Sequence, residues 1–128
     1  MKSISIFTDH SLIYGYEVVY VNPMNGADLV VGHHIGKHTN QAVHRETVNF
    51  EICEYLQGFS IRSGDVVDRV EFVTNYGRSF GFGGFGGSHK TILDRTAGKR
   101  IVAIGGGCGG HMHNFKVWFF CYIFYVCK

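Results

Sequence analysis

The sequence predicts an all-β protein in which one β-hairpin unit is repeated three times. Glycine provides 18 of the 128 residues, proline occurs once, and aromatic residues make up 15%. That is about twice the usual share of glycine and far less proline than the usual ~5%, which is typical of a turn-rich β protein. No segment carries apolar residues at helical spacing over more than two turns.

The repeated unit consists of a short strand ending in Ile, a polar or glycine-containing turn, and a second strand with alternating apolar residues. It occurs in residues 4–20, 59–73 and 102–118. Copies that begin roughly 45 to 55 residues apart predict a pseudo-threefold architecture. We therefore expect three equivalent hairpins around a common core.

Further strands are expected between these units. Residues 21–26, VNPMNG, form a strong turn signal, so residues 27–32 should return as the second strand of a hairpin. Residues 32–47 are predicted to be a histidine-rich polar connection. Residues 48–55 alternate apolar and polar side chains, which predicts a strand with Val48, Phe50 and Ile52 on one face.

Composition places limits on class and location. The length suits one domain, residues 1–128, and the mild net charge of +2 calls for no nucleic-acid partner. Residues 115–127 are apolar but shorter than the twenty or so residues that a membrane span needs, so buried strands are expected. The N-terminus lacks the apolar core of a signal peptide, which favours a cytoplasmic or unconventionally secreted protein. No CxxC pair is present, so buried free thiols are expected at Cys53, Cys108, Cys121 and Cys127.

The central stretch carries the candidate chemistry. Its predicted turn, SGDVVD, contains a Gly-x-x-x-Asp pattern that ends at Asp68, and a glycine loop occupies residues 83–87. An ionised carboxylate can accept two hydroxyl protons at once, and backbone N–H groups can donate to other oxygens. Glycine allows the backbone to approach a ligand with no Cβ in the way. This combination suits the ring of hydroxyls on a sugar.

Residues 63–68, the Gly-Gly-x-Gly-Gly loop and the run GKRIVAI at 98–104 resemble the jacalin-related lectins, in particular their mannose-binding branch. The resemblance implies a β-prism I fold of three four-stranded Greek-key sheets and a non-enzymatic, cofactor-free site for mannose- or glucose-type glycans. Galactose binders of the family have a free N-terminal glycine made by cleavage, whereas this chain begins with Met1. The implied carbohydrate-binding residues are Gly64, Asp65, Val66, Val67, Asp68, Gly83, Gly84, Gly86 and Gly87.

One such site is expected in the chain. In the third unit the position of the aspartate holds His113, and in the first unit it holds Tyr14 with no glycine four residues earlier. A neutral imidazole cannot accept two hydroxyls as a carboxylate does. About five or six hydrogen bonds at a net ~0.5–1.5 kcal/mol each, less the cost of immobilising a ligand, leave about 4 kcal/mol and a dissociation constant on the order of a millimolar. Useful binding would then need several sites, which favours a homo-oligomer.

The alternative is an interaction or assembly module on the same fold with a vestigial sugar site, as one part of a pore-forming or cell-surface protein. Residues 81–86 also match G-x-G-x-x-G, but no helix follows and no βαβ unit surrounds them, so a dinucleotide site is disfavoured. A metal site is a weaker hypothesis, and no motif for nucleophilic catalysis accompanies Cys108 or Ser88. The histidines considered for a metal are His33, His34, His38, His111 and His113.

The family has a strand ahead of its first repeat unit, and this sequence shows no equivalent. Residues 122–127 form a surplus apolar strand at the other end. We expect this tail to pair within the third sheet or across a symmetric dimer, because an unpaired apolar edge promotes aggregation.

Overall fold

The structure is a computed structural model that describes residues 1–33, 42–93, 99–108 and 111–121. All regular structure in these residues is antiparallel β-strand, as predicted. The strands are β1 (Ser3–Thr8), β2 (Ile13–Val21), β3 (Asp28–His33), β4 (His44–Asn49), β5 (Leu56–Ser63), β6 (Val67–Thr74), β7 (Ser79–Gly83), β8 (His89–Leu93), β9 (Lys99–Cys108) and β10 (Met112–Cys121). None of the described segments is a helix able to cross a membrane.

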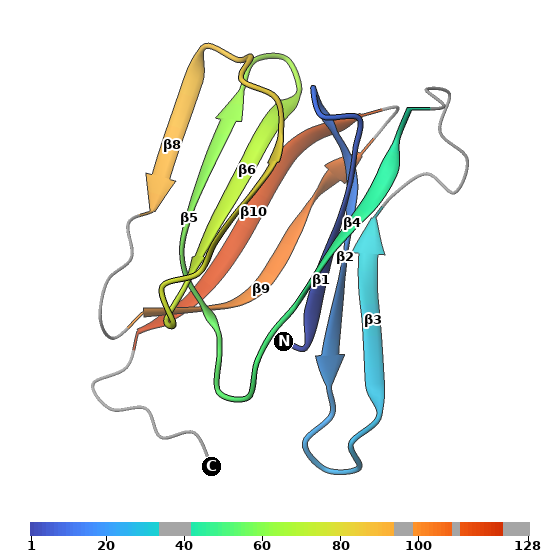
Figure 1. Ribbon diagram of the computed structural model, residues 1–128, viewed down its shortest axis with the longest axis vertical. Helices are drawn as coiled ribbons and strands as arrows, with labels where there is room; N and C mark the ends of the chain where they lie inside the picture. Colours follow the sequence, from blue (N-terminus) through green and yellow to red (C-terminus); the bar gives the residue numbers. More distant parts are fainter. Residues whose placement is uncertain (34–41, 94–98, 109–110, 122–128) are drawn as a thin grey trace.

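The strands form a β-prism with repeated Greek-key connections (Figure 1). The first sheet has the order β3-β2-β1-β4 and the second has the order β7-β6-β5-β8, so each places a central hairpin between the two strands that follow it. The third sheet has the pair β10-β9 within the described residues. The predicted fold class is confirmed, and the three repeated segments are the three central hairpins.

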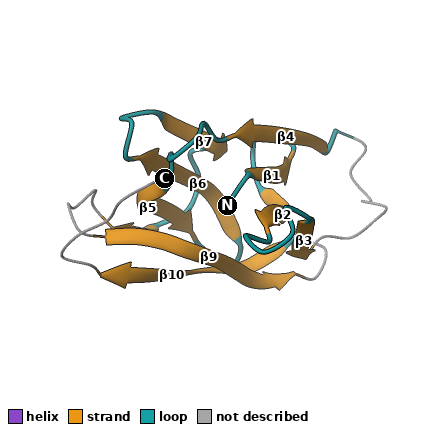
Figure 2. Ribbon diagram, turned by 90° about the horizontal axis from the view of Figure 1, so that it is seen from below, coloured by secondary structure: helices purple, strands orange, loops and turns teal. Residues whose placement is uncertain are grey.

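The core lies where the three sheets face one another (Figure 2). Phe72 of β6 is fully buried, and its ring lies 6.0 Å from that of Phe115 of β10. Phe59 and Tyr16 also contact Phe115, with ring centroids 6.4 and 5.9 Å apart. Such aromatic pairs add about 0.5–1.5 kcal/mol each beyond their buried area. One aromatic cluster thus joins all three hairpins.

The predicted turn at residues 21–26 is present. The N–H of Asn22 donates to the carbonyl of Ala27 at 2.8 Å, and Gly26 has a φ of +70°, which favours glycine. β3 pairs with β2 directly afterwards, from Asp28 opposite Val21. This hairpin is a local feature that turn chemistry alone specifies.

The strand predicted at residues 48–55 is wrong in its position. β4 spans His44–Asn49, so it includes the end of the predicted histidine-rich connection, and the chain turns after Phe50. Ile52, expected on the apolar face, is 85% exposed. The turn is set by Cys53, which has a φ of +65°, and by the carboxylate of Glu54, which accepts the N–H of Glu51 at 2.9 Å.

Glu54 also anchors this turn to the second sheet. Its side chain is fully buried and accepts hydrogen bonds from Arg78 Nε at 2.8 Å, from Arg78 Nη2, and from Thr74 Oγ1 at 2.8 Å. The hydrogen bond from Arg78 is the main reason that the pKa of Glu54 falls to about 2, with help from the N–H of Glu51 and from Thr74 against the opposing effect of burial. Glu54 can stay ionised in this buried position because both of its carboxylate oxygens accept hydrogen bonds.

The expectation of four free thiols is wrong, because Cys53 is in a disulfide. Sequence spacing could not reveal it, since the bond depends on which strands the fold brings together. Its sulfur partner lies outside the described side chains. The predicted tail strand at residues 122–127 lies outside the described residues as well.

Candidate functional site

The turn between β5 and β6 brings the first half of the candidate site to one end of the prism (Figure 1). The N–H of Gly64 donates to the carbonyl of Val66 at 3.1 Å, and Ser63 pairs with Val67 after a shift in register. Val67 is fully buried and anchors the turn to the core. Asp65 remains exposed, and Asp68 follows on β6 with its side chain partly exposed.

The glycine loop supplies the second half and begins where β7 ends, at Gly83. This residue has a φ of +97°, and a Cβ placed on it would lie 2.1 Å from the backbone oxygen of Asp68. The N–H of Gly84 donates to that same oxygen at 3.0 Å and to the carbonyl of Ser11 at 3.2 Å. The loop is therefore held against β6 and against the turn between β1 and β2.

The carboxylate of Asp68 lies directly against the far end of this loop. A Cβ on Gly86 would be 2.8 Å from Oδ1, and a Cβ on Gly87 would be 2.8 Å from Oδ2. A Cβ on Gly64 would lie 3.9 Å from the Cα of Gly87, so the turn and the loop share one surface. Among the residues that the structure describes, none donates a hydrogen bond to the Asp68 carboxylate. Its acceptor oxygens remain available to a ligand.

The two halves play different parts from those that the sequence alone suggested. Gly84 is buried and its N–H is already used, so it supports the loop and does not face a ligand. Val67 can offer only backbone atoms, because its side chain fills the core. In the part of the chain that is described, the N–H groups of Asp65 and Val66 donate to no other backbone group, which leaves them free to serve as donors.

Two arginines that sequence reasoning missed brace the glycine loop. Arg62 Nε donates to the carbonyl of Gly86 at 3.1 Å, and Arg69 Nη1 donates to that of Gly83 at 3.2 Å. The guanidinium of Arg69 also lies 4.7 Å from the ring centre of Phe85, whose side chain is 79% exposed at the loop tip. Their only signal in the sequence is their position on the strands that flank the turn.

In the equivalent turn of the first sheet, the aspartate carboxylate already accepts hydrogen bonds from the protein. The carboxylate of Asp9 accepts the N–H groups of Ser11 and Leu12, both at 2.9 Å, and the hydroxyl of Tyr14 at 3.0 Å. A carboxylate with these three donors has little capacity left for a sugar. In the third sheet the His111 ring lies 4.8 Å from that of Tyr14, and the side chain of His113 lies outside the described residues. The other histidines considered for a metal site also have side chains outside the described residues; they are His33, His34 and His38.

The match of most of the chain to a lectin family model places this prism in the lectin class of carbohydrate-binding proteins. Residues 1–117 match the jacalin-like lectin domain, and the chain belongs to this family of non-enzymatic, carbohydrate-binding proteins. The family resemblance predicted from the central motifs is confirmed.

Individual relatives agree with this assignment. Griffithsin from Griffithsia sp. (strain Q66D336) is 34% identical over 88 residues, which are 68% of this chain and 67% of griffithsin. Malaysian banana lectin aligns with a TM-score of 0.77 at 18% identity, and the Calsepa lectin in complex with a biantennary N-glycan aligns with a TM-score of 0.78 at 18% identity. Both alignments cover 94% of this chain and 82% of the other. At these identities the structural likeness establishes the fold.

Proposed function

We propose that the chain binds mannose- or glucose-type glycans reversibly, as one lectin domain over residues 1–128 with a single sugar site. The site consists of Asp68, the turn at residues 64–67 and the loop at residues 83–87. The observation that carries the proposal is the carboxylate of Asp68, which has no hydrogen-bond donor among the described residues and lies against Gly86 and Gly87. Binding requires no cofactor.

The geometry supports a simple mode of recognition. The carboxylate accepts protons from two neighbouring hydroxyls of the sugar ring, and the N–H groups of Asp65 and Val66 donate to ring and exocyclic oxygens. Gly86 and Gly87 leave the space beside the carboxylate open, because any side chain there would meet its oxygens at 2.8 Å. The bond from Arg62 to the carbonyl of Gly86 holds the loop in place before a ligand arrives, which reduces the entropy cost of binding.

The preference for mannose or glucose rests on the resemblance of the Gly-x-x-x-Asp turn and the glycine loop to the mannose-binding branch of the family. Glycan complexes of relatives, such as the Calsepa lectin with a biantennary N-glycan, are consistent with a glycan ligand. A single site of about millimolar affinity favours recognition of clustered sugars by an assembly with several sites, so we also propose a homo-oligomer.

The test is Asp68→Asn, which keeps the shape of the side chain and removes its charge. Asparagine keeps one acceptor oxygen but loses the charge and the second acceptor, and a hydrogen bond to a charged group is worth about 1.5–3 kcal/mol, so binding should weaken on the order of 10- to 100-fold. Titration calorimetry with methyl α-mannoside, methyl α-glucoside and methyl α-galactoside measures both affinity and preference. The melting temperature should stay within a few degrees, because the carboxylate has no partner among the described residues.

The matched control is Asp65→Asn, which removes an exposed carboxylate three residues away and keeps its backbone N–H. This variant should bind as the wild type does. Excess EDTA should leave the affinity unchanged, because the proposed contacts are hydrogen bonds alone. Equal sugar binding by Asp68→Asn and wild type would overturn the site assignment.

The alternative, an interaction or assembly module, draws support from β3. This strand lies at the edge of the first sheet and exposes Leu29, Val30 and Val31 by 59, 55 and 43%. An exposed apolar edge can pair with another chain. A glycan array that retains no ligand, together with a self-association that Leu29→Lys abolishes, would favour this function over sugar binding.

A further inference from the structure

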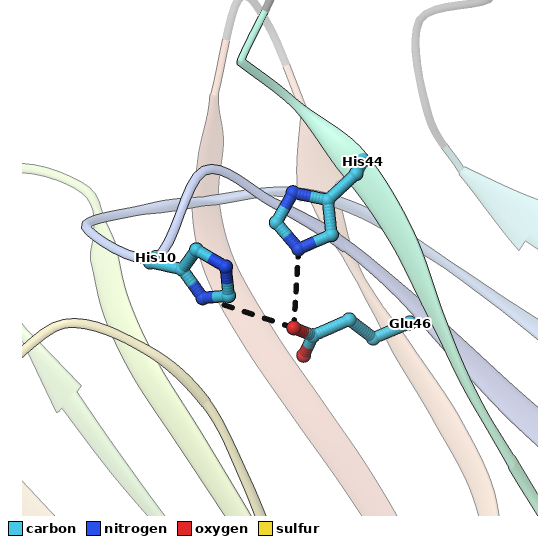
Figure 3. A group of neighbouring side chains, drawn as sticks. All are labelled: His10, His44 and Glu46. Carbon is cyan, nitrogen blue, oxygen red and sulfur yellow. Dashed lines mark hydrogen bonds and ion pairs between the residues drawn. The ribbon is translucent and has the colours of Figure 1, made fainter.

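A second cluster of chemically active side chains lies beside the first sheet, where the turn between β1 and β2 contacts the glycine loop at Gly84 (Figure 3). His10 comes from the turn between β1 and β2, and His44 and Glu46 come from β4. His44 Nε2 lies 3.1 Å from Glu46 Oε1, and His10 Nδ1 lies 3.7 Å from the same oxygen. The two imidazole rings are 4.4 Å apart, and one donor atom of each residue lies within 4.8 Å of the other two.

Strand pairing accounts for this arrangement. β4 is antiparallel to β1, with His44 opposite Thr8 and Glu46 opposite Ile6. His44 and Glu46 are two residues apart and therefore point to the same face of the strand. The turn that carries His10 begins directly after Thr8, at the end of β1 next to His44. Residues 34 positions apart in the sequence are thus brought into contact by sheet topology.

The backbone at His10 is held in an uncommon conformation. Its φ is +70°, a backbone conformation that residues other than glycine rarely adopt. Such conformations are found more often at functional positions. The N–H of His10 donates to Thr8 Oγ1 at 3.0 Å, and the fully buried Thr8 hydroxyl donates to the carbonyl of Leu12 at 2.7 Å. The His10 side chain is 71% exposed, yet its origin is fixed by these bonds. The ring is therefore presented to solvent from a defined position.

We propose that His10, His44 and Glu46 bind one divalent transition-metal ion of the Zn²⁺ type. Bonds of about 2.0–2.1 Å in a tetrahedral site place donor atoms about 3.3 Å apart, close to the two separations measured here from Glu46 Oε1. Two imidazoles and one carboxylate with an open fourth position are a common ligand set for zinc. The site differs from the sugar site in every residue and is independent of the proposed function.

The surroundings of His44 suit a metal ligand. Its Nδ1 lies 3.2 Å from the carbonyl of Ala42, to which an Nδ1–H can donate. In the metal-free protein the Nε2–H can donate to Glu46 Oε1 at 3.1 Å, and a bound metal ion would take the place of that proton while the Ala42 carbonyl keeps the ring oriented. Ca²⁺ and Mg²⁺ are disfavoured, because they prefer sets of oxygen ligands and this cluster offers one carboxylate.

The experiment is a titration of the metal-stripped, full-length chain with ZnCl₂, followed by calorimetry and repeated with CaCl₂. Each of three variants should lower the affinity of one Zn²⁺ binding event by at least about tenfold: His10→Gln, His44→Gln and Glu46→Gln. Replacing even a residue that only hydrogen-bonds to a metal ligand commonly lowers metal affinity by that factor. CaCl₂ should give no comparable event. The matched control is His111→Gln, which removes a histidine near Tyr14 outside the cluster and should leave the event unchanged.

Cobalt gives a second readout. CoCl₂ bound to the wild type should produce the visible absorption of a four-coordinate site, and each of the three variants should lose it. Equal melting temperatures of the metal-free proteins show that the loss is not unfolding, and three separate variants guard against one that fails to fold. Zn²⁺ binding by all three variants at wild-type affinity, or no Zn²⁺ binding by the wild type, would overturn the proposal.

Discussion

Replacement of Glu54 by Gln should destabilise the protein far more than its position in an irregular turn suggests. The carboxylate is fully buried and accepts hydrogen bonds from Arg78, Thr74 and the N–H of Glu51. A glutamine keeps the size of the side chain but replaces one acceptor oxygen with an NH₂ group that faces donors. The substitution removes the ion pair with Arg78 and leaves a donor that faced the lost oxygen, such as the buried Thr74 hydroxyl, without its acceptor, which is destabilising.

The magnitude follows from the pKa of Glu54. Its folded-state pKa of about 2 lies below the ordinary glutamate value of 4.5, and each pKa unit of difference corresponds to 1.36 kcal/mol. The carboxylate therefore contributes on the order of 3 kcal/mol of stability at neutral pH. Because the folded pKa is the lower one, this contribution is complete above pH 4.5 and declines as the pH falls from 4.5 towards 2. Wild-type stability should decrease through that window.

Urea unfolding at pH 7 and pH 3, with the Cys53 disulfide kept oxidised, measures both effects. The difference between wild type and Glu54→Gln should be about 3 kcal/mol at pH 7 and clearly smaller at pH 3. The control is Asp28→Asn, which breaks an exposed ion pair with Lys2 and should change stability by less than about 1 kcal/mol. A Glu54→Gln protein as stable as wild type at pH 7, or a difference that stays constant down to pH 3, would refute this reasoning.

Two further predictions concern the sugar site and the core. Gly87→Ala should abolish sugar binding, because the residue has a φ of +82° and the new Cβ would lie 2.8 Å from Asp68 Oδ2. Titration with methyl α-mannoside measures the affinity of this variant. An affinity equal to that of the wild type would contradict the geometry of the site. Phe72→Ala should lower the free energy of unfolding by about 3–5 kcal/mol, because the ring is fully buried among those of Phe59 and Phe115. Urea denaturation tests it, and a loss below about 1 kcal/mol would mean that the ring does not fill the core.

Local chemistry determined much of what could be predicted. Alternating apolar residues and turn signals specify the three hairpins, because strand periodicity and turn conformation depend on near neighbours in the chain. The Asn-Pro and Asn-Gly turn before β3 is of this kind, and so is the conjunction of Asp68 with a glycine loop fifteen residues later. The sequence was therefore sufficient for the fold class and the family, whereas the residues of the candidate sugar site remain a prediction.

Tertiary structure decided which turn aspartate is available. Asp9 and Asp68 both lie in or beside the turn of a central hairpin, but Asp9 is occupied by the Tyr14 hydroxyl and two N–H groups, whereas Asp68 faces two glycines. The difference depends on what packs against each carboxylate. Gly84 shows the same point, because its N–H is used by Ser11, which is 73 positions away in the sequence.

Long-range contacts also decided where sequence reasoning failed. Residues 48–55 alternate like a strand, yet the chain turns at Cys53, and the buried Glu54 of this turn is held by Arg78, 24 residues further along the chain. The cluster of His10, His44 and Glu46 has no sequence motif, since it arises from the pairing of β1 with β4. Periodicity reports only on neighbours within one strand. Which strands meet, and therefore which distant side chains share a charge or a ligand, is settled when the sheets close around their common core.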